Sequence, residues 1–311
     1  MSIAIPESLN EQLSHQLSQV IGFIYPNEVE TQWAILIVVY PYITGIVAGA
    51  FILASLVKVF NVVEVQPIYR LALLTALAFM LVAGMPLQLH LGHPERAYEI
   101  FMTPQPTSAM AMFGFVYLWY LLGILLIEIW FEYRQQLILM AREAHGVMKG
   151  VYSALSLFSK DLSPEAIAFD KKASKLVTII GIPSAFLLHG YVGFIFGSVK
   201  ANPWWGSVLM PIVFLMSAIV SGIAMVMFIY ILLTMLRNEK IDMVCLDKVG
   251  LFLLVAIIVD FSLEALDYIH RLYQSEESIG ILTELVSAKL FTSLVVVQLL
   301  SLIHISEPTR H

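Results

Sequence analysis

Two groups of ionisable residues interrupt an otherwise apolar chain. The first is a polar heptapeptide, HLGHPER at residues 90–96, which follows a nearly continuous apolar stretch from Ile68. The second is a row of acids at Asp260, Glu264 and Asp267. Their i, i+4, i+7 spacing predicts that they share one face of a helix. Ionisable groups at membrane depth are costly and rarely face lipid, so both groups are candidate functional sites.

The composition indicates a membrane protein. Of the 311 residues, 59% are hydrophobic and 13% are charged, and the mean hydropathy is +0.84. A soluble domain has about 25% charged residues. The single cysteine, Cys245, excludes a disulfide framework and any iron-sulfur cluster ligated by cysteines of this chain alone. The sequence has no basic stripe, so the lipid bilayer is an expected partner and nucleic acid is not.

Seven stretches are long and apolar enough to cross about 30 Å of hydrocarbon as helices. They lie at residues 33–57, 69–91, 110–132, 176–198, 208–236, 249–270 and 281–302. Because backbone groups cannot stay unpaired in lipid, and the sequence lacks the alternation of barrel strands, we expect an all-α polytopic membrane bundle over residues 33–299. Gly45 and Gly49 in the first span predict close packing between helices.

Lysine and arginine are distributed unevenly between the two sides of these spans. Twelve fall in the loops after the first, third and fifth spans, most of them between Arg134 and Lys175, and three fall on the other side. The positive-inside rule therefore predicts that the N-terminus and the heptapeptide are outside, on the periplasmic side of a bacterial cytoplasmic (inner) membrane. In this orientation Asp260 lies near the middle of the sixth span, and Glu264 and Asp267 lie successively nearer the outer face.

The segments outside the spans have separate interpretations. Residues 1–32 carry apolar side chains at helical spacing, which predicts an amphipathic helix on the outer membrane face or against a partner protein. The loop between Arg134 and Lys175 is expected to hold two short helices, the second with an N-cap at Ser163. Residues 300–311 resemble a translated sequencing adapter, so we expect the native sequence to differ there, and we assign them no function.

The residues alone leave three classes of membrane protein open. Acids and histidines at one face suit a quinone site, which needs donors for two carbonyl oxygens, a proton path and apolar walls. A b-type haem membrane anchor would need facing histidines, and His90, His189 and His270 are the candidates at suitable depth, too few for two haems. A secondary transporter would show inverted repeats and helices broken near the midplane, and the sequence has no evident repeat.

Four motifs occur in order along residues 33–300. They are the stretch from Trp33 through Tyr40-Pro41-Tyr42 to Gly45–Ala50, the heptapeptide, Pro106–Met110, and Trp204-Trp205 with Pro211, Phe214, Ser217 and Gly222. Together they resemble the NrfD family, the group of polysulfide reductase membrane subunits. The resemblance implies a bundle of eight helices without haem, so eight spans are expected in the intact protein. It also implies menaquinone or ubiquinone as the cofactor.

The resemblance implies partners as well. Iron-sulfur clusters are expected only in a ferredoxin-like partner subunit, docked over residues 92–109, with a molybdopterin or other catalytic subunit beyond it. In relatives the first position of the heptapeptide is often aspartate, so His90 replaces one proton-carrying group with another.

We therefore predict a quinone- or quinol-interacting integral membrane subunit of a respiratory oxidoreductase complex, with no metal site of its own. The predicted quinone-binding residues are His90 and Arg96, followed by Tyr40, His189 and Tyr191. The predicted proton-transfer residues are Asp260, Glu264 and Asp267.

Overall fold

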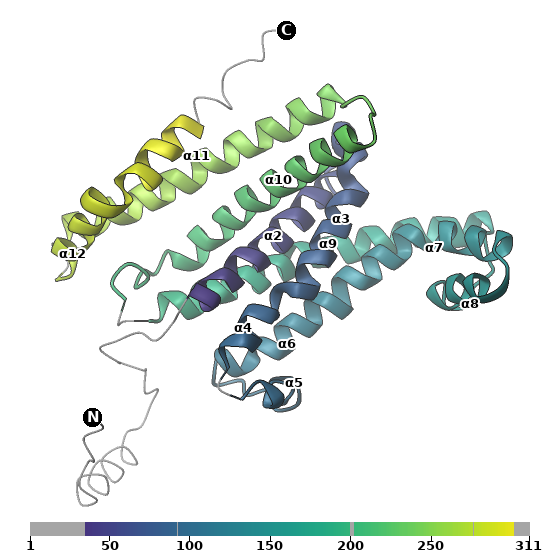
Figure 1. Cartoon of the computed structure of the whole chain (residues 1–311), viewed down its shortest axis with the longest axis horizontal. Coiled ribbons are helices and arrows are strands. Elements are labelled where there is room, and N and C mark those ends of the chain that lie inside the picture. The colour runs from purple at the N-terminus through teal and green to yellow at the C-terminus, as the bar shows by residue number, and fades with distance from the viewer. Residues whose placement is uncertain (1–34, 92, 200–201, 276, 302–311) are drawn as a thin grey trace, which may run out of the picture.

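The computed structural model describes residues 35–301, apart from 92, 200, 201 and 276. Within these residues all regular structure is helical, and seven helices are long and apolar enough to cross a membrane. The predicted fold class and the predicted number of spans in this chain are therefore confirmed (Figure 1). The amphipathic segment predicted at 1–32 lies outside the described residues, as do residues 302–311.

The first four spans include two that are built from several helical segments. The first span is α2 (Ile35–Lys58), and the second combines η1 (Val63–Val65), α3 (Gln66–Ala83) and α4 (Met85–His90). The third combines η3 (Met110–Met112), α6 (Phe113–Leu118), the π-helical η4 (Trp119–Leu125) and α7 (Leu126–Glu143). The fourth is α9 (Pro164–Gly197).

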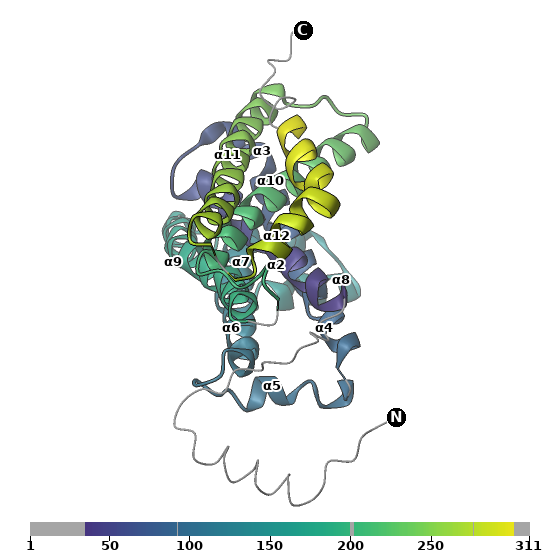
Figure 2. The ribbon, with the colours of Figure 1, turned by 90° about the vertical axis from the view of Figure 1, so that its left-hand side faces the viewer.

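The last three spans follow with short connections. They are α10 (Met210–Leu236), α11 (Met243–Tyr273) and a final span made of α12 (Ile279–Glu284) and the π-helical η5 (Leu285–Val297), continuing to Ser301. Two further helices, η2 (Pro94–Arg96) and α5 (Glu99–Met102), lie in the loop after α4, and α8 (Gly146–Leu155) lies between α7 and α9. Figure 2 shows α4 and α5 at one end of the bundle.

The prediction of two short helices in the loop after the third span is half wrong. Only α8 is separate, because α7 continues to Glu143 and α9 runs unbroken from Pro164 into the fourth span. The predicted cap is confirmed, since Ser163 Oγ accepts a hydrogen bond from the backbone N–H of Ala166 at 3.2 Å. No helix-breaking residue follows the cap before the apolar stretch, so the helix that starts in water simply enters the membrane.

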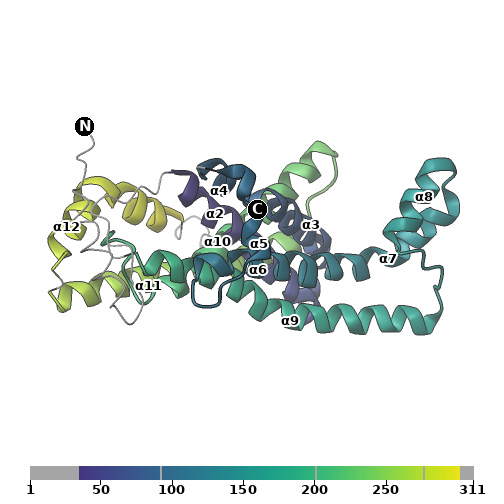
Figure 3. The same ribbon diagram turned by 90° about the horizontal axis from the view of Figure 1, so that it is seen from below.

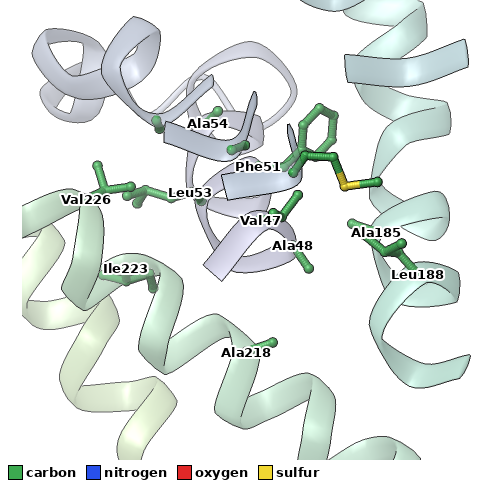
Figure 4. Packing of buried hydrophobic residues seen from close by; sticks show 14 of the residues in the cluster. Val47, Ala48, Phe51, Leu53, Ala54, Ala185, Leu188, Ala218, Ile223 and Val226 are labelled. Carbon is green, nitrogen blue, oxygen red and sulfur yellow. The ribbon is translucent and has the colours of Figure 1, made fainter. Parts of the chain in front are cut away.

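Helix α2 lies at the centre of the bundle and packs against α3, α9 and α10. Figure 4 shows Val47 and Ala48 of α2 between Ala185 of α9 and Ala218 of α10. The backbones of α2 and α10 touch where glycine faces glycine: a Cβ at Gly222 would lie 2.5 Å from the Cα of Gly49. This contact confirms the predicted packing role of Gly49 and brings the neighbouring polar residues of both helices together.

The two ends of the bundle differ in their charged residues. At one end Glu132 of α7 bonds both Lys58 Nζ, at 2.9 Å, and Arg70 Nε, at 2.8 Å. The parts of α7 and α9 beyond this ion pair, together with α8, extend away from the bundle, as the view from below shows (Figure 3). We call this end the lysine-rich face and the opposite end, where α4 ends and η2 and α5 lie, the heptapeptide face.

Candidate functional site

A cavity of about 490 Å³ lies in the half of the bundle nearer the heptapeptide face. Its walls come from α2, α9, α10, α11, the final span and the loop between α9 and α10. Apolar and aromatic side chains form most of the wall, among them Trp204, Trp205, Phe214 and Phe261. Its volume falls within the range of about 300–1,000 Å³ that is usual for small-molecule pockets, so a drug-sized planar ligand would fit.

His189 of α9 forms part of one wall of this cavity. Its side chain is buried, its Nδ1 lies 3.4 Å from Thr44 Oγ1, and its ring stacks against Phe214 with the ring centroids 5.7 Å apart. Gly45 of α2 makes this arrangement possible, because a Cβ there would lie 3.2 Å from His189 Cε1. The imidazole is therefore held in one orientation beside the cavity by contacts from α2 and α10.

The acids of α11 lie along the opposite wall. Glu264 lines the cavity and its Oε2 accepts a hydrogen bond from Gln298 Nε2 at 3.1 Å. Asp267 also lines the cavity, accepts a hydrogen bond from Ser207 Oγ at 2.5 Å and pairs with Arg271 Nε at 3.1 Å. These contacts place two carboxylates beside the open volume, as their helical spacing predicted.

Asp260 lies one turn deeper on the same helix. Its side chain is buried, it is not among the residues that line the cavity, and its Oδ1 has no hydrogen-bond partner among the described residues. Glu264 is four residues away on the same face, so the two carboxyl groups are neighbours along α11. A proton on either group would be close to the other.

Arg271 continues the row toward the heptapeptide face. Its Nη1 donates a hydrogen bond to the backbone oxygen of Pro203 at 2.7 Å. Asp267 and Arg271 together therefore tie α11 to the loop that carries Trp204 and Trp205. These contacts hold the loop beside α11, and Trp205 also packs edge-on against Phe196 of α9, with the ring centroids 4.9 Å apart.

The other residues predicted to bind quinone do not line the cavity. His90 is the half-buried last residue of α4, and Arg96 is exposed and forms a two-bond pair with Glu99, with both distances 2.9 Å. Tyr40 is buried edge-on against Phe113, and the hydroxyl of Tyr191 is buried without a partner among the described residues. Their assignment to a quinone site stays a prediction.

Three residues at or beside the cavity wall are not predicted as site residues from the sequence. Trp204 and Trp205 stand out only as parts of a motif, although paired tryptophans at a span end are typical of the membrane interface. Gln298, the partner of Glu264, could have been singled out from the sequence only as a polar amide within the apolar final span. The positions of all three depend on how distant segments pack, which local spacing does not reveal.

A second buried acid, Glu128 of α7, lies toward the lysine-rich face. Its side chain is fully buried, and its Oε1 accepts hydrogen bonds from Tyr69 Oη, Ser174 Oγ and Thr178 Oγ1, each at 2.9 Å. Two neighbouring helices thus supply three hydroxyl donors to one carboxyl oxygen. This arrangement joins α3, α7 and α9, and a carboxyl group with this many donors is well suited to a structural role.

Comparisons with known proteins identify the family. The model of the family described as "Polysulphide reductase, NrfD" matches residues 26–310. A selenate reductase subunit of Mesobacillus selenatarsenatis is 35% identical over 249 residues, which cover 78% of this chain and 58% of that protein. A putative dimethyl sulfoxide reductase membrane subunit of Halobacterium salinarum is 28% identical over 241 residues, which cover 76% of this chain and 52% of that protein.

The chain thus spans little more than half the length of these two curated relatives. The family model, by contrast, covers nearly all of the chain, including every described helix and the residues of the cavity. The chain belongs to the NrfD polysulphide reductase family of membrane proteins.

Proposed function

We propose that this chain is the quinone-interacting membrane subunit of a reductase complex and that the cavity between α2, α9, α10 and α11 binds the quinone head. The observation that supports this most strongly is the composition of the cavity wall. Aromatic side chains enclose a volume of about 490 Å³, and His189, Glu264 and Asp267 contribute polar groups at its edge. A quinone needs this combination: flat apolar surroundings for the ring and a few polar groups for its oxygens.

The donor set fits a quinone better than a haem. His189 carries an imidazole N–H of the type that donates to a carbonyl oxygen, and Tyr268, which also lines the cavity, carries a hydroxyl that donates to Thr283 Oγ1 at 3.1 Å in this structure and would have to turn to reach a ligand. Axial ligation of a b-type haem commonly takes two histidines, and His189 is the only histidine among the described lining residues. The quinone proposal therefore uses the groups that are present, whereas a haem would lack a second ligand of the usual kind.

The acids of α11 are proposed to handle the protons. A bound quinol supplies two electrons to the partner and two protons to the pocket, and a bound quinone takes up the same number. Glu264 is the acid that faces the cavity beside Gln298, and Asp267 lies one turn nearer the heptapeptide face. We propose that Glu264 exchanges protons with the ligand, that Asp260 holds a proton deeper in the helix, and that Asp267 connects the row to water.

The names of the relatives and the position of the cavity support a proposal for the partners. The two relatives are named as subunits of a selenate reductase and of a putative dimethyl sulfoxide reductase. We propose that this chain likewise joins an iron-sulfur subunit and a catalytic subunit, and that the iron-sulfur subunit docks on the heptapeptide face. Electron transfer requires proximity, and this is the face nearer the cavity.

The test is quinol oxidation by the purified complex that contains this chain. With a reduced quinone analogue as donor, His189→Ala and Glu264→Gln should each lower turnover at least about 10-fold, because a positioned acid or base contributes roughly 100-fold or more and part of that is retained by neighbouring groups. Arg96→Gln tests the alternative location predicted from the heptapeptide, because Arg96 is charged but exposed and paired with Glu99 away from the cavity.

The outcome separates two locations for the site. Loss of turnover in the His189 and Glu264 variants, with Arg96→Gln unchanged, supports the cavity. Loss in Arg96→Gln alone would move the site to the heptapeptide. Unchanged turnover and inhibitor binding in all three variants would refute a quinone site in this chain.

A further inference from the structure

Helix α8 presents its apolar face outward. Val147, Val151 and Leu155 recur at i, i+4 and i+8 on α8 and are all exposed, Val147 at 83%; Phe158, in the turn after the helix, is exposed at 74%. The opposite face carries the less exposed residues Tyr152, Ser153 and Ser156 and packs against α7. A helix that faces water would show the reverse pattern, so the apolar side of α8 is a candidate contact surface, above all at its C-terminal end, where Leu155 adjoins the exposed Leu157 and Phe158.

The end of α8 returns to the level of the membrane boundary. Trp130 Nε1 of α7 donates a hydrogen bond to the backbone oxygen of Leu155 at 3.1 Å. Trp130 lies two residues before Glu132, the acid that pairs with Lys58 and Arg70 where their spans meet the lysine-rich face. Tryptophan side chains are typical of membrane–water interfaces. Leu155 and the residues after it therefore lie at interfacial depth, whereas Val147, near the start of α8, lies about 12 Å away along the helix axis.

The turn after α8 holds two large apolar residues in an unusual conformation. Leu157 and Phe158 have φ values of 53° and 57°, in the left-handed region where glycine or asparagine is usual. The turn is fixed on both sides: Phe158 N–H donates to Ser153 O at 2.7 Å, and Arg134 Nη1 donates to Ser159 Oγ at 2.8 Å. The exposed pair Leu157-Phe158 is thus a rigid apolar tip.

The segment around this tip is rich in basic side chains, which complement an anionic lipid surface. Between Arg142 and Lys175 six basic side chains are exposed, against three exposed acids. The basic side chains are Arg142, Lys149, Lys160, Lys171, Lys172 and Lys175. Clustered lysines beside an amphipathic helix attract anionic headgroups.

We propose that the C-terminal end of α8 and the tip at Leu157-Phe158 form an anionic-phospholipid binding surface on the lysine-rich face. The tip inserts among the headgroups and the lysines bind their phosphates. This surface lies at the opposite end of the bundle from the cavity, and it does not depend on the proposed quinone function. Its role is to fix the depth and tilt of α7 and α9, the two helices that extend beyond the membrane.

The test measures the depth of the tip in lipid. The full chain with Cys245→Ala receives a single fluorescent label at Phe158→Cys, or at Val147→Cys as the control on the same helix face. Each protein is placed in nanodiscs of phosphatidylcholine, with or without phosphatidylglycerol, and quenched by a headgroup nitroxide or by iodide in water. We expect lipid quenching at position 158 to exceed that at position 147 by about twofold or more, and iodide quenching to show the reverse.

The lysines provide the second readout. Phosphatidylglycerol should increase lipid quenching at position 158, and replacing Lys149, Lys160, Lys171 and Lys172 by glutamine should remove that increase. Lys240→Gln, an exposed lysine in another loop on the same side, should leave it unchanged. If Phe158→Cys does not fold, Leu157→Cys reports on the same tip.

Two results would overturn the proposal. One is equal exposure of positions 158 and 147 to iodide in every nanodisc. The other is protection of position 158 only when partner subunits are added, which would make the tip a protein interface.

Discussion

Replacing Glu128 by leucine should destabilise the bundle much more than replacing it by glutamine. The acid is fully buried, and three hydroxyls donate to its Oε1 at 2.9 Å. Leucine removes that acceptor. Thr178 keeps a second bond, to the backbone oxygen of Ser174 at 2.9 Å, so the hydroxyls of Tyr69 and Ser174 are the two left without this partner.

Two estimates give the size of the destabilisation that Glu128→Leu should cause. Hydrogen bonds between side chains in membrane proteins average about 0.6 kcal/mol, so three of them contribute roughly 2 kcal/mol. A buried polar group left unpaired costs about 1–3 kcal/mol, so two of them cost roughly 4 kcal/mol. We therefore expect Glu128→Leu to lower the free energy of unfolding by about 2–4 kcal/mol, which is roughly 30- to 700-fold in the unfolding equilibrium constant.

Glutamine is the matched control. Its carbonyl oxygen can occupy the place of Oε1, and its amide replaces Oε2, an atom that has no hydrogen-bond partner among the described residues. Glutamine keeps the acceptor for the three hydroxyls and replaces Oε2, which is buried and unpaired within the described part of the chain, by an unpaired amide, so Glu128→Gln should cost clearly less than Glu128→Leu. Unfolding of the purified chain from mixed micelles by increasing SDS measures both variants. Equal destabilisation by glutamine and leucine, or none by leucine, would refute the reasoning, because the acceptor would then not be what stabilises the contact.

Three further substitutions test the packing and the ends of the helices. Gly222→Ala should destabilise the bundle by about 1–3 kcal/mol or more in the same assay, because its Cβ would lie 2.5 Å from the α2 backbone. The control, Gly250→Ala, should not destabilise it, because among the described residues no atom from another part of the chain lies within 4 Å of the new Cβ. Arg134→Met should cost about 3–5 kcal/mol by leaving the carboxylate of Asp170 buried without its partner at 2.7 Å, and the further change Asp170→Leu should recover much of this loss. Ser163→Ala should cost about 0.5–2 kcal/mol through loss of the α9 cap, and hydrogen exchange at the first turn of α9 should show the fraying.

The spans could be predicted because a membrane imposes a local rule. About 20 apolar residues in a row are needed, and such runs are visible in the sequence without any knowledge of packing. The same rule explains why the ends of two helices could not be predicted. Hydropathy detects only the part of a helix that lies in lipid, so the extension of α7 to Glu143 and the continuity of α9 from Pro164 give no signal.

The cavity could be predicted only in part, for a similar reason. Glu264 and Asp267 share a helix, so their spacing is sufficient to place them together, and the depth of His189 brings it to the same half of the bundle. The contact between Glu264 and Gln298 joins residues 34 positions apart, and no periodicity encodes it. The heptapeptide is harder to interpret, since Arg96 has its acid, Glu99, only three residues away and can satisfy its charge within the loop.

Glu128 and Glu264 show why burial of an acid is not by itself evidence of chemistry. Three hydroxyls from α3 and α9 donate to one oxygen of Glu128, which offsets the cost of removing it from water and leaves that oxygen few sites for a ligand. Glu264 accepts a hydrogen bond from Gln298 and borders an open volume. A ligand in that volume would lie beside Glu264, and we propose that it exchanges a proton with this acid. The two acids should then respond in opposite ways: a change at Glu264 to glutamine should alter quinol turnover with little effect on stability, and a change at Glu128 to leucine should alter stability first.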